Sequence, residues 1–201
     1  MYKNIIFDIG NVLLSFNPIE YLSSKIQQPE KVLEVHKELF QSEEWLMLDR
    51  GTITEEEAKN AIANRSVANG DLIRLSFENW YDLLTPIEPS VEVLKLLKDS
   101  NYKIYFLSNF HLLAFDHILE KYDFFKLFDG GIVSYKEKLI KPEEAIYRRL
   151  IEKYDLNPKE SIFIDDVEEN IEGAKNLGIN TILLKDPALL KEHLKTYNIY
   201  L

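Results

Sequence analysis

The sequence of 201 residues contains no cysteine, no surplus of basic charge and no long hydrophobic run. The lack of cysteine excludes a disulfide-built secreted scaffold and a metal site with thiolate ligands. No window approaches the roughly 18 uninterrupted apolar residues of a membrane-spanning helix, so we expect no membrane partner. Asp8 interrupts the apolar run near the N-terminus and no small-residue cleavage site follows. We therefore expect no signal peptide and a cytoplasmic protein.

Acidic side chains outnumber basic ones by 34 to 24, which gives a formal net charge of −10. Nucleic-acid binders gain much of their affinity by neutralising phosphates with Lys and Arg, so we expect no nucleic-acid partner. A hydrophobic fraction of 46% is enough for one large core, or for a core with a smaller inserted unit. The composition favours an ordered protein with small-molecule or protein partners. We expect a monomer or homodimer.

Five short apolar runs indicate the strands of a parallel sheet. They are rich in Ile, Phe, Val and Leu without clean alternation, which is typical of strands buried on both faces. Segments of helical length separate the later runs, so we expect an α/β fold with a doubly wound, Rossmann-like parallel sheet of about five strands. The runs are Asn4–Phe7, Lys103–Leu107, Gly131–Ser134, Ser161–Ile164 and Thr181–Leu184.

A long segment without a strand pattern separates the first two runs. It has 95 residues, whereas a simple crossover connection needs about a dozen. We expect an α/β core domain of residues 1–15 and 85–201 with an inserted, all-helical cap domain of residues 16–84. The helices predicted in the insert are Pro29–Gln41, Thr54–Ala63 and Asp71–Leu83.

Polar side chains follow four of the predicted strands. Ligands of open α/β sheets bind beyond the carboxyl ends of the strands, so these side chains are expected at one edge of the sheet. Each alone has an ordinary explanation as a turn residue, a helix cap or a solvated lysine, but their coincidence at successive strand ends favours a site. They are Asp8, Ser108, Asn109, Lys141, Asp165 and Asp166.

These residue types suit metal-assisted phosphate chemistry. Three clustered carboxylates repel one another unless a cation joins them, and hard oxygen ligands select Mg²⁺. A hydroxyl group, backbone N–H groups and a lysine supply donors for phosphoryl oxygens, and an Asp carboxylate can attack phosphorus. The sequence therefore predicts a magnesium and phosphate site.

Four motifs carry a resemblance to a known family. FDIGNVLL, FLSNF, the pair Lys141-Pro142 and FIDDVEENIEGA, in that order, resemble the motifs of the haloacid-dehalogenase-like (HAD) hydrolase superfamily, and the position of the insert resembles its subfamily IA with a helical cap. DIGNV and DRGTIT are most similar to small bacterial phosphatases of the α-D-glucose-1-phosphate phosphatase type. The resemblance implies a Mg²⁺-dependent phosphomonoesterase for a small phosphorylated metabolite, such as a hexose 1-phosphate.

The resemblance also implies roles for the residues that handle the phosphate. Asp8 is expected to attack the phosphoryl group and to form an aspartyl-phosphate. Ser108 is expected to bind a phosphoryl oxygen with help from the Asn109 backbone, and Lys141 to neutralise charge on nucleophile and phosphate. On the cap, Arg50 is a candidate for substrate contact.

Metal ligation is implied in the same way. Asp166 is expected to bind Mg²⁺ directly, together with Asp8 and the carbonyl group of Gly10. Asp165 is expected to act directly or through a water molecule.

The sequence departs from the family pattern at Gly10. Most phosphatases of the superfamily have a second Asp there, two residues after the nucleophile, as general acid and base, a contribution of about 10²–10⁴-fold. Three accounts stay open: a leaving group that needs little protonation, a substitute among His111, Asp49 and Arg50, or a protein that binds phosphorylated ligands with poor turnover. We favour the first, because the phosphatases that the chain resembles share the glycine.

Other side chains have ordinary explanations. His111 is expected to be a helix-start residue. The cap aromatics Phe40, Trp45, Phe77 and Trp80 are expected to form the core of the cap rather than a platform for a sugar.

Two alternative functions remain. A haloacid dehalogenase also uses an Asp nucleophile but needs no metal, which leaves the Asp165-Asp166 pair without a task. A phospho-accepting switch clusters similar residues, but it has its acidic pair on the first strand and no such insert.

Overall fold

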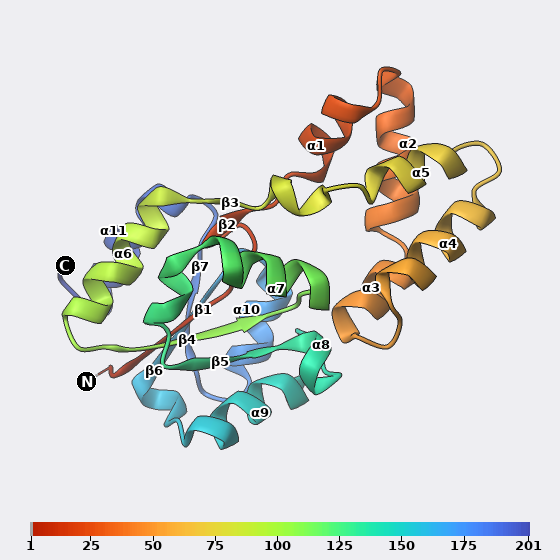
Figure 1. Ribbon diagram of the computed structural model, residues 1–201. Helices are drawn as coiled ribbons and strands as arrows, with labels where there is room; N and C mark the ends of the chain where they lie inside the picture. The colour runs from red at the N-terminus through yellow and green to blue at the C-terminus, as the bar shows by residue number, and fades with distance from the viewer. Residues whose placement is uncertain (1) are drawn as a thin grey trace.

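The computed structural model describes residues 2–201 and has a central sheet of five parallel strands in the order β5-β4-β1-β6-β7. The predicted doubly wound α/β fold is confirmed (Figure 1). Both ends of each predicted strand lie within one residue of the ends of the observed strand. The strands are β1 (Asn4–Phe7), β4 (Lys103–Ser108), β5 (Gly130–Val133), β6 (Ser161–Asp165) and β7 (Asn180–Leu183).

Helices cover both faces of this sheet. Ile5 and Phe7 of β1 point into one hydrophobic cluster and Ile6 into another, as the alternation of side chains along a strand requires. Helices α6, α7 and α11 pack on the first cluster, and α9 and α10 on the second. The bounds are α6 (Glu88–Asp99), α7 (Leu112–Lys121), α8 (Ser134–Glu137), α9 (Glu144–Tyr154), α10 (Glu168–Lys175) and α11 (Leu190–Lys195), with 3-10 turns η2 (Asp123–Leu127), η3 (Pro158–Glu160) and η4 (Pro187–Leu189).

The insert is helical and stands to one side of the sheet (Figure 1). Thr54 and Glu57 form a capping box. The prediction of one helix over Asp71–Leu83 was wrong, because Asn79 adopts a left-handed φ of 56° that a continuous right-handed helix cannot contain. The elements are α1 (Pro18–Lys25), α2 (Pro29–Phe40), α3 (Glu43–Arg50), α4 (Glu55–Arg65), α5 (Gly70–Ser76) and η1 (Trp80–Leu83).

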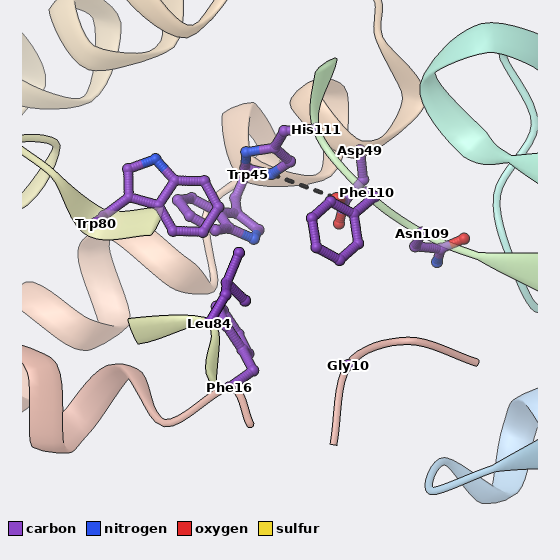
Figure 2. Close-up of a pocket in the computed structure, with 9 residues that line it drawn as sticks. All are labelled: Gly10, Phe16, Trp45, Asp49, Trp80, Leu84, Asn109, Phe110 and His111. Carbon is purple, nitrogen blue, oxygen red and sulfur yellow. Dashed lines mark ion pairs between the residues drawn. The ribbon is translucent and has the colours of Figure 1, made fainter. Parts of the chain in front are cut away.

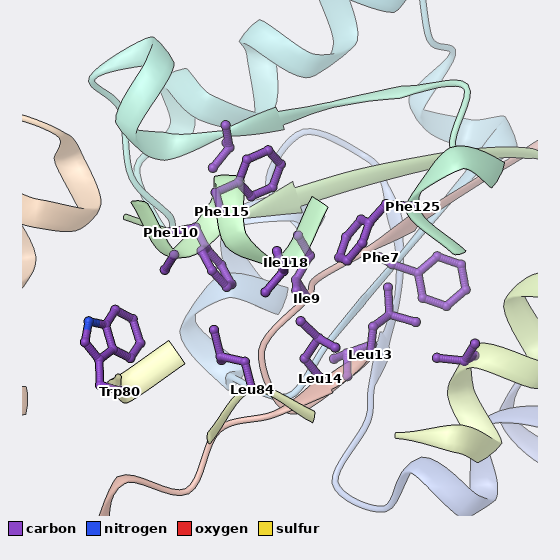
Figure 3. Close-up of a cluster of buried hydrophobic side chains, with 14 of the residues drawn as sticks. Phe7, Ile9, Leu13, Leu14, Trp80, Leu84, Phe110, Phe115, Ile118 and Phe125 are labelled. Carbon is purple, nitrogen blue, oxygen red and sulfur yellow. The ribbon is translucent and has the colours of Figure 1, made fainter. Parts of the chain in front are cut away.

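A two-stranded antiparallel ribbon joins the insert to the sheet-bearing part. It consists of β2 (Leu14–Ser15) and β3 (Thr85–Pro86), so both chain crossings are tied together. The ribbon lies at the expected boundaries, and we propose that residues 16–84 form a cap domain on a core domain of residues 1–15 and 85–201. The hydrophobic cluster of β1 continues through Leu84 to Trp80 of the cap (Figure 3). Within residues 2–201, the helices are all too short or too polar to cross a membrane.

Candidate active site

The carboxyl ends of three adjacent strands bring the candidate residues together. Asp8 follows β1, which pairs with β4 on one side and β6 on the other. Ser108 is the last residue of β4, and Asp165 is the last residue of β6. Because the strands are parallel, these ends meet at one edge of the sheet, as expected.

The Asp8 side chain is held by three donors. Ser108 Oγ donates to Asp8 Oδ1 at 2.6 Å, the Ile9 N–H donates to the same oxygen at 2.7 Å, and Lys141 Nζ lies 2.9 Å from it. All three contacts go to Oδ1, and Oδ2 takes part in none of them. Asp8 therefore has a fixed orientation with one oxygen free for a substrate or a cation.

Lys141 links this carboxylate to the acidic pair. Its ammonium group is buried and lies 2.6 Å from Asp165 Oδ2 as well as 2.9 Å from Asp8. The Asn109 side chain accepts from the Lys141 N–H at 2.8 Å and donates to the Lys141 carbonyl at 3.0 Å. The Asn109 amide therefore fixes the backbone that carries the lysine.

The two acidic residues after β6 differ in their surroundings. Asp165 is fully buried and accepts hydrogen bonds from the Val167 N–H at 2.8 Å and from Asn170 Nδ2 at 3.1 Å, in addition to Lys141. Asp166 is partly exposed and accepts from Asn11 Nδ2 at 3.3 Å. Asp166 thus keeps more free capacity for a ligand than Asp165 does.

Asn11 and Asn170 belong to the site but were not singled out from the sequence. Both lie within the quoted motifs, and Asn170 is in the first turn of the helix that follows the acidic pair. The position of Asn170 in the helix directly after Asp165 and Asp166 is the sequence signal that could have identified it. Asparagine side chains here orient carboxylates without adding charge.

The three carboxylates fit a divalent cation. One oxygen each from Asp8, Asp165 and Asp166 lies within 4.8 Å of the others. Burial and the charge of Asp165 together raise the pKa of Asp8 to about 7, against the pull of Lys141. Burial and the charge of Asp165 also raise the pKa of Asp166. A hard cation would relieve this repulsion and favour the ionised carboxylates.

A cavity of about 100 Å³ lies between the cap and the end of the sheet (Figure 2). Its walls are mostly aromatic and aliphatic, with three polar side chains. Trp45 and Trp80 line it, so two of the predicted cap-core aromatics also face the site, whereas Phe40 and Phe77 pack behind Trp45. The lining residues are Gly10, Phe16, Trp45, Asp49, Trp80, Leu84, Asn109, Phe110 and His111.

His111 takes part in this cavity. It is the residue before α7, as expected, but its side chain makes no capping hydrogen bond and is buried. In Figure 2 a dashed line joins it to Asp49, where His111 Nε2 lies 3.3 Å from Asp49 Oδ1. The interpretation as a mere helix-start residue was therefore incomplete.

Arg50 has another partner in this structure. Its guanidinium group forms a two-pronged contact with Glu143 of the core, at 3.1 and 2.5 Å, and is absent from the cavity lining. Arg50 thus ties the cap to the core, and its contact with substrate stays a prediction.

Comparison with known proteins now decides the family. Residues 2–178 match the family model described as haloacid dehalogenase-like hydrolase. The chain belongs to this hydrolase family. The predicted superfamily is thereby confirmed, while the closer similarity to α-D-glucose-1-phosphate phosphatases stays a prediction.

Among curated relatives of this HAD-like hydrolase, a sesquiterpene phosphatase of Aspergillus oryzae is 26% identical and covers 92% of this chain and 91% of its own length. A drimenol cyclase of Aspergillus calidoustus is 28% identical over 91% of this chain, but the match spans only 34% of the cyclase.

Solved structures of HAD family members have the same fold. A HAD family enzyme from Bacteroides thetaiotaomicron is 26% identical, with a TM-score of 0.74 over 96% of this chain and 98% of that one. The same enzyme in complex with magnesium and inorganic phosphate has a TM-score of 0.71 at 25% identity over 90% and 93%. A dehalogenase with an intermediate complex has a TM-score of 0.69 at 17% identity over 90% and 83%, which shows the shared fold alone.

Proposed function

We propose that this HAD-like hydrolase is a Mg²⁺-dependent phosphomonoesterase that acts on a small phosphorylated metabolite through an aspartyl-phosphate on Asp8. The observation that carries the proposal is the meeting of Asp8, Ser108 and Lys141 beside a trio of carboxylates. The trio suits Mg²⁺, and the hydroxyl and ammonium groups suit phosphoryl oxygens. The magnesium and phosphate bound to the Bacteroides relative support the same assignment.

Each residue has a chemical task in this proposal. The free oxygen of Asp8 attacks phosphorus, while Lys141 and the Ile9 N–H keep the side chain oriented. The Ser108 hydroxyl turns from Asp8 to the phosphoryl group, to which Lys141 also offers a donor. Asp166 and the Gly10 carbonyl would hold the cation together with the Asp8 oxygen that the Ser108 hydroxyl releases, and Asp165 fixes Lys141. The bound cation supplies positive charge that offsets the negative charge of carboxylates and phosphate.

The organic part of the substrate is proposed to occupy the cavity beside Gly10. The prediction of a sugar phosphate is compatible with Asp49, Asn109 and His111, which can bind hydroxyl groups. The predominantly apolar walls favour a second candidate, the monophosphate of an apolar alcohol, and the sesquiterpene phosphatase among the relatives supports it. Burial of apolar surface contributes about 25 cal/mol per Å². The kcat/KM values for sugar phosphates and for monophosphates of apolar alcohols are therefore expected to differ.

A phosphate-release assay tests the proposal. The panel contains hexose 1-phosphates and 6-phosphates, other phosphorylated metabolites and isoprenoid monophosphates, each with Mg²⁺ and with chelator. Turnover is expected with Mg²⁺ only, and Asp8→Asn is expected to abolish it. Full activity of Asp8→Asn would refute the covalent mechanism, and halide release from a 2-haloacid in chelator would favour the dehalogenase alternative.

A further inference from the structure

The proposed reaction needs a proton carrier, which Gly10 cannot provide, because a leaving group that departs with little protonation still leaves the second step without a base. Its two steps first release an alcohol and then consume a water molecule, so one group has to give a proton and take it back. A Cβ atom built on Gly10 has no heavy atom within 4 Å, and Gly10 lines the cavity. The space that an Asp side chain at position 10 would fill is therefore open. The group that transfers the proton has to belong to another residue that lines the cavity.

The Asp49 carboxyl group lines the same cavity from the cap side (Figure 2). Asp49 lies in the last turn of α3. Within residues 2–201, His111 is the one basic residue with a side-chain nitrogen within 4.0 Å of the Asp49 carboxyl oxygens. The carboxyl is thus free to meet a ligand in the cavity.

The end of α3 is anchored to the core at this point. Ser134 Oγ donates to the Asp49 carbonyl, Lys138 Nζ donates to the Gly51 carbonyl, and Arg50 contacts Glu143. These three contacts, from α8 and the segment before α9, place the Asp49 side chain over the end of the sheet. Two of these contacts also engage the cationic groups of Arg50 and Lys138.

The protonation state of Asp49 suits proton transfer near neutral pH. Burial raises its pKa to about 7, while the charge of Lys141 lowers it and that of Asp8 raises it. Burial lowers the pKa of His111 to about 3, so Asp49 faces a neutral imidazole rather than an imidazolium. A group with a pKa near the working pH is an effective general acid and base.

We propose that the Asp49 carboxyl group, placed against His111 at the cavity, is the general acid and base of the reaction; the inference rests on the proposed phosphatase function. In the first step Asp8 forms a bond to phosphorus, the bond from phosphorus to the leaving oxygen breaks, and that oxygen takes the proton of Asp49. In the second step Asp49 takes a proton from water, the water oxygen bonds to phosphorus, and the bond from phosphorus to Asp8 breaks. One water is consumed, and both carboxyl groups return to their starting state.

Two esters of similar shape separate the two steps. The leaving group of p-nitrophenyl phosphate departs without a proton, whereas that of benzyl phosphate needs one. Wild type, Asp49→Asn and the matched control Asp71→Asn are mixed with each ester and Mg²⁺, and product is followed before and after the first turnover. Asp71 is an exposed cap residue outside the cavity, so its variant is expected to behave as wild type.

Asp49→Asn is expected to release one equivalent of p-nitrophenolate at nearly the wild-type rate and then to stall as phospho-Asp8, with steady turnover lowered about 100-fold or more. With benzyl phosphate the same variant is expected to show no burst, and its first turnover to slow by at least about 100-fold. The p-nitrophenolate burst also shows that the variant is folded.

Other outcomes overturn the inference. If Asp49→Asn slows the first turnover of both esters equally, or of neither, Asp49 is not the proton carrier, although Mg²⁺-dependent turnover by the wild type would still support the phosphatase function. If wild type releases neither phosphate nor alcohol from either ester, nor phosphate from the metabolite panel, while it binds Mg²⁺, the proposed function itself fails.

Discussion

The ammonium group of Lys141 lies 2.6 Å from the carboxylate of Asp165, and both side chains are buried. Burial alone lowers the pKa of Lys141, but the charges of Asp165 and Asp8 outweigh it and hold the pKa above its ordinary value. The lysine is therefore charged in the folded protein, where it offsets part of the negative charge of the site.

Removing this charge is expected to destabilise the protein. Loss of one partner of a buried ion pair costs about 3–5 kcal/mol, so Lys141→Met is expected to lower the free energy of unfolding by about 3 kcal/mol in chelator, measured by urea denaturation. Lys126→Met, which removes a pair that is exposed on both sides, is expected to change it by less than about 1 kcal/mol. Equal effects of the two changes would contradict this account of Lys141.

Magnesium is expected to stabilise the fold in the absence of substrate. It binds the folded carboxylate trio and not the unfolded chain, so Mg²⁺ at 100 times its Kd adds about 2.7 kcal/mol. The thermal midpoint is expected to rise with Mg²⁺ and to fall on chelation. Asp166→Asn is expected to lose most of this response, whereas Asp99→Asn, at the exposed end of α6, is expected to keep it; a full response in Asp166→Asn would argue against Asp166 as a ligand.

Gly10→Asp is expected to supply a second proton carrier. The open space at the Gly10 Cβ position allows the side chain, so turnover of benzyl phosphate is expected to rise more than that of p-nitrophenyl phosphate. In the Asp49→Asn background the gain is expected to approach the factor of about 10²–10⁴ that general acid–base help provides. Steady-state kinetics of wild type, Gly10→Asp, Asp49→Asn and the double variant measure this gain in turnover. Complete loss of activity in Gly10→Asp would mean that close approach of the Gly10 backbone is itself required.

Asp129 is expected to make folding stability depend on acid pH. Burial raises its pKa, but hydrogen bonds from Lys98, the Ile104 N–H and Lys103 outweigh burial and hold the pKa at about 2. Because this folded-state pKa lies below the ordinary value of 3.8, the stabilisation is full above about pH 4 and is lost as the pH falls towards 2.

Asp129→Asn is accordingly expected to cost about 1 kcal/mol at pH 7, after allowance for solvent screening of its lysine partners. The difference from wild type is expected to shrink between pH 4 and pH 2 in urea denaturation curves. Lys126 also lowers the pKa of Asp123, but solvent screens this fully exposed pair, so Asp123→Asn is expected to show a much weaker dependence. A difference that stays constant down to pH 2 would contradict the assignment.

Local sequence was sufficient for the sheet but not for the whole insert. The strands were predictable because runs such as Asn4–Phe7 are apolar throughout, and burial on both faces leaves little alternative. Helices α1 and α3 were not predicted, since each has only eight residues, which leaves few positions in which a helical period can show. The ribbon of β2 and β3 was also missed, because its two-residue strands are defined by their pairing and not by composition.

The sequence by itself determined which chemistry-bearing residues meet at the sheet edge. Asp8, Ser108 and Asp165 follow strands whose parallel order forces their ends together. Only the tertiary structure decided which side chains of other segments face these strand ends. The contact of Asp49 with His111 depends on how the cap docks on the core, and the raised pKa of Asp49 depends on the burial which that docking creates. Both are properties of packing between distant segments, which local patterns along the chain do not encode.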